Sequence, residues 1–280
     1  MNPKIRYFGW SALSIEASAG NLFFDPFFRE YCGARWYGLD DFAHANVVCI
    51  THGHEEHYLD TPAVVARSGA DVVGTKAVCD YLRFRSRVPR ERLHPVQPFE
   101  PVDVRGFGIT TFRWQHRDIN LWKALTKALF QGNATQLSWA WSSATNAPFY
   151  SDYTGFHVTL PGGLTVLNYN EGFNTKMTDA EIAEIGSRLR TDVLLAGMQL
   201  TFTEDVARGA AALDPRIVVL YAPHDHFHRM MGVSSSPWQE FKAAVERRLP
   251  KAKVIIAEPG TSIDAVTGEA TRSPPALAAA

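Results

Sequence analysis

The chain has 280 residues, of which 46% are hydrophobic and 20% are charged, enough for one large domain with a sizeable core. Its formal net charge of −1 offers no basic surface to a nucleic-acid backbone, so we expect no nucleic-acid partner. Three cysteines without CxxC spacing favour reduced thiols over disulfides or a zinc knuckle. The sequence shows no signal-peptide pattern and no run of about 18 apolar residues. We therefore expect a cytoplasmic protein without an integral membrane segment, and its oligomeric state stays open.

Short strands open the chain, and strands and helices then alternate. The first three predicted strands form a β-meander that ends at Asp25-Pro26, where proline stops the ladder of backbone hydrogen bonds. The apolar, β-branched run 46–51 is typical of a strand buried on both faces. Asp60 and Thr178 are expected to cap the helices that follow them. In chain order we expect strands 4–9, 12–17, 21–25 and 46–51, helix 61–69, strand 71–74, helix 75–86, strand 107–114, hairpin 154–168, helix 178–190, strand 192–196, helix 203–213, strand 216–221, helix 237–248 and strand 253–257.

One segment interrupts this alternation. Residues 117–152 contain apolar side chains at helical spacing, including Trp122 and Phe130. An insertion of this length is commonly a lid or a binding loop. We therefore predict one domain over 1–270 with a lid-like insertion whose Trp122 and Phe130 contact substrate, against the alternative of a helix that only covers a sheet edge. The tail 271–280 is expected to be disordered.

Three histidines and two glutamates lie directly after the buried strand 46–51. The end of a strand followed by a tight loop projects neighbouring side chains into one pocket, and Gly53 allows such a turn. Imidazoles and carboxylates at this density would repel one another if charged and would lose hydration if neutral. A bound divalent cation resolves both problems, so the run predicts a metal site and not a solvated polar loop. Its sequence is Thr51-His52-Gly53-His54-Glu55-Glu56-His57.

This run resembles the HxHxDH signature of the metallo-β-lactamase superfamily, with Glu56 at the position of the family's aspartate. Two further stretches, Phe8-Gly9-Trp10-Ser11 and Leu22-Phe23-Phe24-Asp25-Pro26, resemble the N-terminal hairpin of that superfamily. They are most similar to its branch of ascorbate-phosphate lactonases and N-acylphosphatidylethanolamine-hydrolysing phospholipases D. The positions of the family's later ligands are matched, in the right order, by His116, Asn170-Glu171-Gly172 and His224.

The resemblance implies an αββα sandwich, an α/β fold of four layers with its site at one edge. It also implies two divalent metal ions, with zinc as the first choice and manganese or iron as alternatives. Both expected aspartates are glutamates here, and the longer arm changes the geometry around a metal, so a single metal or a site without metal remain alternatives. Asn170 is the other candidate for the bridging position of Glu171. Carried over by position, the first metal takes His52, His54 and His116, the second takes Glu56, His57 and His224, and Glu171 bridges the two.

Further residues are expected around these ligands. Asp25 is expected to hydrogen-bond a ligand imidazole, or else only to end its strand. His226 and His228 are expected to contact substrate or a ligand, with solvated loop histidines as the alternative. Aromatic residues between 27 and 37 and in the insertion are expected to wall an apolar cleft, or else to pack the insertion onto the body. The basic residues among them, which suit an anionic group, are Arg29, Arg35, Arg117 and Lys123.

The implied reaction is hydrolysis by a metal-activated water, with Glu56 and Glu171 as catalytic carboxylates. Two cations that share a water lower its pKa toward neutrality and polarise the bond under attack. No GxSxG motif offers a serine nucleophile instead. We therefore expect a hydrolase that cleaves an ester-like bond (phosphodiester, lactone, thioester or amide) in a small, amphiphilic, anionic substrate. The alternatives are a di-iron redox protein of the same fold and a non-catalytic binding protein that kept the fold.

Overall fold

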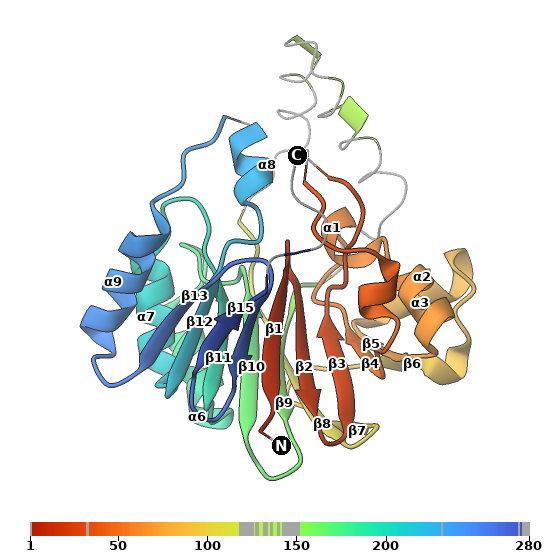
Figure 1. The fold of residues 1–280 in the computed structure, drawn as a ribbon, viewed down its shortest axis with the longest axis horizontal. Coiled ribbons are helices and arrows are strands. Elements are labelled where there is room, and N and C mark those ends of the chain that lie inside the picture. The colour runs from red at the N-terminus through yellow and green to blue at the C-terminus, as the bar shows by residue number, and fades with distance from the viewer. Residues whose placement is uncertain are drawn as a thin grey trace.

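Two sheets lie face to face at the centre of the molecule, with helices on both outer sides (Figure 1). The structure, a computed structural model, describes residues 2–31, 34–117, 126, 129, 130, 134, 137, 138, 141, 152–230, 232–273 and 275. Within this part of the chain, no helix has the length and apolar character needed to cross a membrane.

The first sheet has the strand order β15-β14-β1-β2-β3-β4-β5-β6. The strands from β15 to β3 are antiparallel to their neighbours, and those from β3 to β6 are parallel. The predicted meander is therefore the antiparallel part of a mixed sheet. The strands are β1 (Lys4–Gly9), β2 (Ala12–Ala17), β3 (Gly20–Phe24), β4 (Val47–Cys49), β5 (Asp71–Gly74), β6 (Leu93–Pro95), β14 (Thr261–Asp264) and β15 (Ala270–Arg272).

The second sheet has the strand order β13-β12-β11-β10-β9-β8-β7. Strands β10 to β13 are parallel, and β7 to β10 are antiparallel to one another. Since β8 and β10 are both antiparallel to β9, they point the same way. The strands are β7 (Val102–Val104), β8 (Phe107–Arg113), β9 (Thr154–Thr159), β10 (Thr165–Asn170), β11 (Val193–Gly197), β12 (Ile217–Tyr221) and β13 (Lys253–Ala257).

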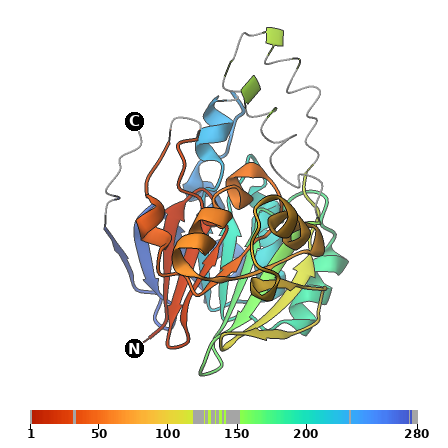
Figure 2. The same ribbon diagram turned by 90° about the vertical axis from the view of Figure 1, so that its right-hand side faces the viewer.

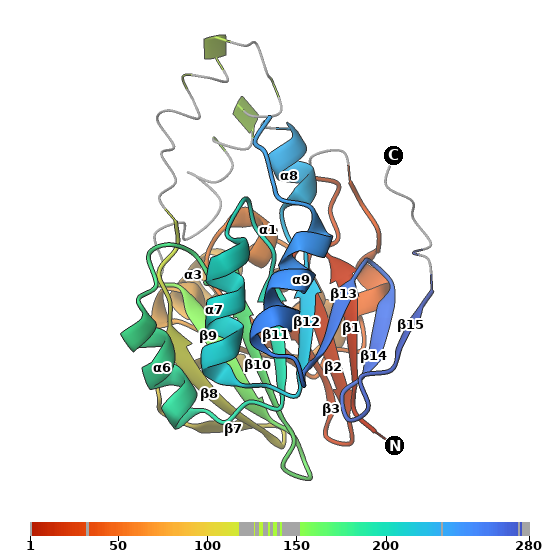
Figure 3. The same ribbon diagram turned by 90° about the vertical axis from the view of Figure 1, so that its left-hand side faces the viewer.

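Helices cover the outer face of each sheet. Figure 2 shows the orange helices α1 to α3 in front of the first sheet, and Figure 3 shows α6, α7 and α9 in front of the second. Helix α8 stands above the upper edge of the sheets in Figure 1. The helices are α1 (Glu55–Tyr58), α2 (Thr61–Ser68), α3 (Lys76–Arg85), α6 (Asp179–Arg188), α7 (Thr203–Leu213), α8 (Asp225–Met230) and α9 (Trp238–Arg248), with short 3₁₀ helices at Leu39–Phe42 and Arg90–Arg92.

Apolar side chains fill the spaces between these layers. Phe24 of β3 and Phe156 of β9 meet between the sheets, with ring centroids 5.9 Å apart. Phe42 lies in the apolar layer outside the first sheet, and Phe241 of α9 in the one outside the second. Each such fully buried side chain contributes about 1.5–3 kcal/mol of transfer free energy. The layers are thus helix, sheet, sheet and helix, and the predicted αββα sandwich is confirmed.

Every strand and helix expected from the sequence is present, with ends that agree within two residues. Thr178 caps α6 as predicted, and Glu181 completes a capping box. Asp60 precedes α2 but makes no capping hydrogen bond. Its carboxylate instead accepts the backbone N–H groups of Phe28 and Arg29, so the capping prediction was wrong for this residue.

The beginning of the predicted disordered tail is a strand. β15 pairs with β14, with Thr271 opposite Ser262, so the prediction for 271–280 was wrong at Thr271 and Arg272. All three side chains of β15 are exposed, which explains why its sequence lacks the apolar alternation that marks a strand. The tail beyond residue 275 lies outside the described residues.

Candidate metal centre

The predicted ligands meet at one edge of the sandwich. His52 to His57 follow β4, His116 follows β8, Glu171 follows β10 and His224 follows β12. These strands all point toward the same edge, above which α1 and α8 lie in Figure 1. Each of the predicted ligands is buried, and His116 is the most exposed of them at 8%. Four separate segments of the chain thus place metal-binding side chain types in one buried pocket.

Three imidazoles, which we call the histidine group, form one half of this pocket: His52, His54 and His116. Their ligand atoms and a carboxylate oxygen of Glu171 all lie within 4.8 Å of one another. His52 Nε2 and His54 Nδ1 are only 3.0 Å apart. Such a set of nitrogen donors around one point is typical of a site for a divalent transition metal.

Hydrogen bonds fix the orientation of these rings. Thr51 Oγ1 donates to Asp25 Oδ2 at 2.6 Å, so it accepts from His52 Nδ1 at 3.0 Å. His116 Nδ1 donates to the carbonyl of Arg117 at 2.6 Å. The lone pairs of His52 Nε2 and His116 Nε2 therefore point into the pocket when the rings are neutral.

His54, the third ring of the histidine group, also has a neighbour on the side that faces away from His52. The hydroxyl of Tyr153 lies 3.4 Å from His54 Nε2, which leaves His54 Nδ1 to face His52 Nε2. Two ring nitrogens at this separation need a proton or a cation between them. Burial and the neighbouring imidazoles lower the pKa of both His52 and His54 well below the usual value, so both rings are neutral and each has one nitrogen lone pair that a cation can take. A cation therefore fits the histidine group.

A second set, which we call the mixed group, contains Glu56, His57 and His224, whose ligand atoms also lie within 4.8 Å of one another. His57 Nδ1 donates to Asp25 Oδ2 at 2.8 Å, so Nε2 faces inward. Among the residues that the structure describes, the buried His57 Nε2 and Glu56 Oε2 have no hydrogen-bond partner, an arrangement that a bound cation satisfies. Burial lowers the pKa of His57, but Asp25 outweighs it and raises this pKa to about 9.

Glu171 lies between the two groups. Its Oε1 is 3.0 Å from His116 Nε2 and 3.5 Å from His52 Nε2, and its Oε2 is 2.7 Å from His224 Nε2. Burial favours the neutral acid, but His224 and His116 outweigh it and hold the pKa of Glu171 well below its usual value. The carboxylate is therefore ionised and faces both groups, and the longer glutamate side chain reaches them.

Asn170 connects the two sheets through hydrogen bonds. Its Nδ2 donates to Thr51 Oγ1 at 2.9 Å and to Asp25 Oδ2 at 3.2 Å, which ties β10 to the ends of β3 and β4. Asn170 and Asp25 both have positive φ angles, 50° and 42°, which non-glycine residues rarely adopt. Such backbone conformations cluster at functional sites, where the surrounding contacts hold them. Glu171, and not Asn170, is thus the residue that faces the candidate ligands.

The other predicted residues fall into three places. Asp25 contacts the predicted ligand His57, as expected. His228 is buried near Arg117 and Ser235, and burial, followed by His224 and Arg117, lowers its pKa to about 3. His226 lies outside both groups, with its ring 5.2 Å from that of Trp36.

The insertion is covered only in part. Trp122 and most of the predicted lid at 117–152 lie outside the described residues, as does Lys123. Phe130 is described and is 92% exposed, so its ring lies in solvent and not against either group. Phe27, Tyr31 and Trp36 pack on Trp10, and most of the insertion that these aromatic residues were expected to face or to hold lies outside the described residues.

Sequence reasoning missed three residues that support the site: Thr51, Tyr153 and Gln199. Gln199 follows β11 at the same edge, so a search for polar residues after each parallel strand would have found it. Thr51 stands inside the histidine-rich run, but its role depends on Asp25 and Asn170, far away in sequence. Tyr153 precedes an antiparallel strand, and no sequence signal marks it.

Residues 4–221 match the family described as "Beta-lactamase superfamily domain". Together with the fold and the arrangement of histidines, this match identifies the class: the chain belongs to the metallo-β-lactamase superfamily. The resemblance seen in the sequence is thereby confirmed at the level of the superfamily.

Full-length relatives agree with this class. A UPF0173 metal-dependent hydrolase of Methanosarcina mazei is 25% identical over 93% of this chain and 97% of its own. Among solved structures, Igni18, a metallo hydrolase from Ignicoccus hospitalis, has a TM-score of 0.64 at 20% identity and covers 97% of this chain and 98% of its own. CmlA, a diiron β-hydroxylase from Streptomyces venezuelae, has a TM-score of 0.62 at 13% identity and covers 97% of this chain and 54% of its own. These two structures share the fold with this chain.

Proposed function

We propose that this metal-dependent hydrolase binds two divalent cations, one at the histidine group and one at the mixed group, with Glu171 between them. Zinc is the proposed metal, because imidazole nitrogen and carboxylate oxygen are its usual ligands. The proposed reaction is hydrolysis of an ester-like bond (a phosphodiester, lactone, thioester or amide) in a small, amphiphilic, anionic molecule.

One observation carries the proposal. Ring nitrogens and carboxylate oxygens converge in a buried pocket, while the opposite nitrogen of several rings is engaged by Thr51, Tyr153, Asp25 or the carbonyl of Arg117. Outer hydrogen bonds of this kind orient metal-binding histidines and fix their tautomers. A divalent cation at such a site makes a water acidic near pH 7 and polarises the bond under attack.

The proposed catalytic groups of the chain are its two glutamates. Glu171 stays ionised and faces both groups, so it is placed to orient the attacking water between them. Glu56 Oε1 lies 3.7 Å from His224 Nδ1, so Glu56 would help to hold the second cation beside the attacking water. No serine or cysteine nucleophile is required.

Metal analysis combined with a substrate panel tests this function. The purified protein is expected to contain about two zinc ions per chain and to hydrolyse at least one member of a panel of phosphodiesters, lactones, thioesters and amides. Chelation should abolish this activity, and added zinc should restore it. His44→Ala, which removes an exposed imidazole, is the matched control and should keep both metals.

Other outcomes separate the alternatives. Retained iron with oxygen consumption and no hydrolysis would favour redox chemistry, as in a di-iron protein. A folded protein that takes up no transition metal would favour a binding protein. Either result contradicts the proposed hydrolysis.

A further inference from the structure

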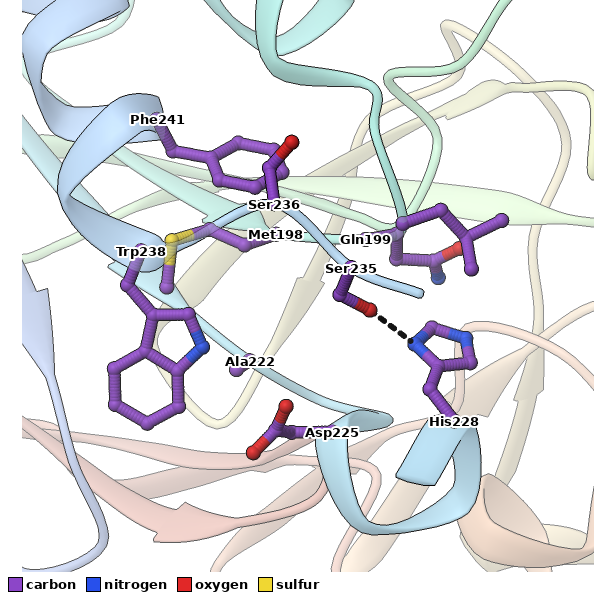
Figure 4. A pocket seen from close by; sticks show the side chains of 10 residues that line it. Met198, Gln199, Ala222, Asp225, His228, Ser235, Ser236, Trp238 and Phe241 are labelled. Carbon is purple, nitrogen blue, oxygen red and sulfur yellow. Dashed lines mark hydrogen bonds between the residues drawn. The ribbon is translucent and has the colours of Figure 1, made fainter. Parts of the chain in front are cut away.

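A charged side chain that neither ligand group uses lies beside the centre. Arg117 directly follows His116, donates from Nε to Gln199 Oε1 at 3.2 Å, and lies with Nη2 3.5 Å from His228 Nε2. Because arginine can only donate, His228 Nε2 is the acceptor. The proton of this imidazole is then on Nδ1, which faces Ser235 Oγ at 3.3 Å (Figure 4). Two neutral side chains therefore hold the guanidinium in place.

Arg29, another of the basic residues singled out in the sequence, has a different environment. Its guanidinium donates to the buried carboxylate of Asp60, which neutralises its charge. Among the described residues, no carboxylate oxygen lies within 4.0 Å of the Arg117 guanidinium. Gln199 and His228 are both 3% exposed and orient Arg117 without compensating its charge. Such an arginine is arranged to receive an oxyanion.

The space beside these two side chains is small. Gln199 and His228 line a cavity of about 10 Å³ together with Trp238 and Phe241 of α9 (Figure 4). This volume holds about one water molecule, so no substrate group enters there. The guanidinium can meet a ligand only on its other sides.

Two neighbours of Arg117, His116 and His228, connect it with the candidate metal centre. His116 precedes it in sequence and lies 3.0 Å from Glu171. His228 packs near His224, with ring centroids 6.0 Å apart, and His224 lies 2.7 Å from Glu171. An oxyanion on Arg117 would therefore lie on the side of the pocket that contains His116 and His224.

We propose that Arg117 binds a phosphate or carboxylate group of the substrate and so determines specificity, with Gln199 and His228 as positioning residues. This inference rests on the proposed function and adds the group that recognises the anion. A planar guanidinium presents two parallel N–H groups to two oxygens of either oxyanion. Arg117 takes no part in bond cleavage in this proposal: its charge binds the anion, and the two glutamates act at the reacting bond.

The test compares Arg117→Gln with Arg113→Gln, a matched control on β8 whose exposed guanidinium pairs with Asp152. Calorimetry measures the binding of inorganic phosphate and of succinate to the metal-loaded proteins, beside metal content and melting temperature. Arg117→Gln should weaken binding of the preferred anion by about 10- to 100-fold, as expected for charge-assisted hydrogen bonds, and keep its metals. Arg113→Gln should bind both anions as the wild type does. The anion that loses more affinity identifies the substrate group.

Two further variants separate charge from position. Arg117→Lys keeps the charge without the paired N–H groups and should recover part of the lost affinity. Gln199→Leu removes the acceptor of Arg117 Nε and should weaken the same anion less than Arg117→Gln does. Arg117→Lys and Gln199→Leu should both keep the metal content of the wild type. If the contact between Arg117 and Gln199 only supported the structure, the metal content would change.

The failures can be told apart. Wild-type protein with its metals that binds neither anion, or Arg117→Gln that binds both normally, overturns the inference and leaves the proposed function intact. Loss of metal or a much lower melting temperature in Arg117→Gln would show that Arg117 supports His116 structurally. This result also overturns the inference. Wild-type protein without any bound metal shows instead that the proposed function has failed, and the inference fails with it.

Discussion

The histidine group and the mixed group share Glu171, but different neighbours support them. Behind the histidine group stand neutral partners: the hydroxyls of Thr51 and Tyr153 and a backbone carbonyl. Behind the mixed group stands the buried carboxylate of Asp25, 2.8 Å from His57 Nδ1. The mixed group thus has fewer imidazoles and more negative charge.

The difference shows two ways in which neighbouring groups orient an imidazole for metal binding. Neutral partners fix the tautomer of a ring, whereas a carboxylate also makes the ring a stronger base. We therefore expect the affinity of the mixed group for metal to depend on charge, and that of the histidine group to depend mainly on ring geometry. Four substitutions test this comparison, in order of decreasing effect.

Glu171→Gln should weaken metal binding at both groups alike, because this carboxylate faces both of them. Metal content should fall at both groups, and turnover should fall by more than about 100-fold, the upper range for residues that only support ligands. Atomic emission analysis and steady-state kinetics measure the two effects. Glu184→Gln, on the exposed face of α6, is the control. A variant with full metal content and turnover would show that Glu171 holds no metal.

Glu56→Gln should affect one group alone. The amide keeps the size of the side chain but removes its charge, so about one metal per chain should be lost and turnover should fall by about 100-fold. The neighbouring Glu55→Gln on α1 is the matched control and should keep both metals, since Glu55 is in neither group. Loss of both metals in Glu56→Gln would mean that the groups do not bind independently.

Asp25→Asn tests the charge behind His57. Asparagine tolerates the positive φ of 42° at this position, so the backbone should not change. The affinity of the mixed group for metal should fall by about 10- to 100-fold, and that of the histidine group, which Asp25 reaches only through Thr51, should fall less. Competition with a chromophoric chelator measures both affinities. Asp60→Asn, at the other fully buried aspartate near this edge, should lower the melting temperature but not the metal affinity.

Tyr153→Phe should have the smallest effect. The ring still stacks on His116, with centroids 4.9 Å apart, and the neutral hydrogen bond of 3.4 Å to His54 is lost. The affinity of the histidine group should fall by less than about tenfold, the lower end of the range for supporting residues. The same chelator competition measures it. An effect as large as that of Asp25→Asn would contradict the distinction between charged and neutral support.

Much of the fold could be predicted because its main elements carry strong local patterns. Val47–Cys49 is apolar and contains two β-branched valines, and both of its faces are buried between layers. β14 escaped prediction because it forms by pairing with β1, more than two hundred residues away. β15 pairs with the nearby β14, and it escaped prediction because its exposed side chains show no apolar alternation. Long-range pairing of this kind leaves little local signal.

The candidate site divides in the same way. His52 to His57 could be found because one loop carries them all, and His116, Glu171 and His224 because each follows a predicted strand. The supports could not be predicted, since Thr51 depends on Asp25 and Asn170, which meet only when both sheets have packed together.

The candidate ligands are spread from residue 52 to residue 224 of a chain of 280. During synthesis, the histidine-rich loop leaves the ribosome long before His224 does, and neither ligand group can form until both sheets are in contact. Under the proposed function, metal uptake therefore comes after the folding of both halves, and the bound ions then stabilise only the finished fold. Metal loading would act as a checkpoint, by which the cell activates complete copies of the enzyme and leaves truncated ones inert.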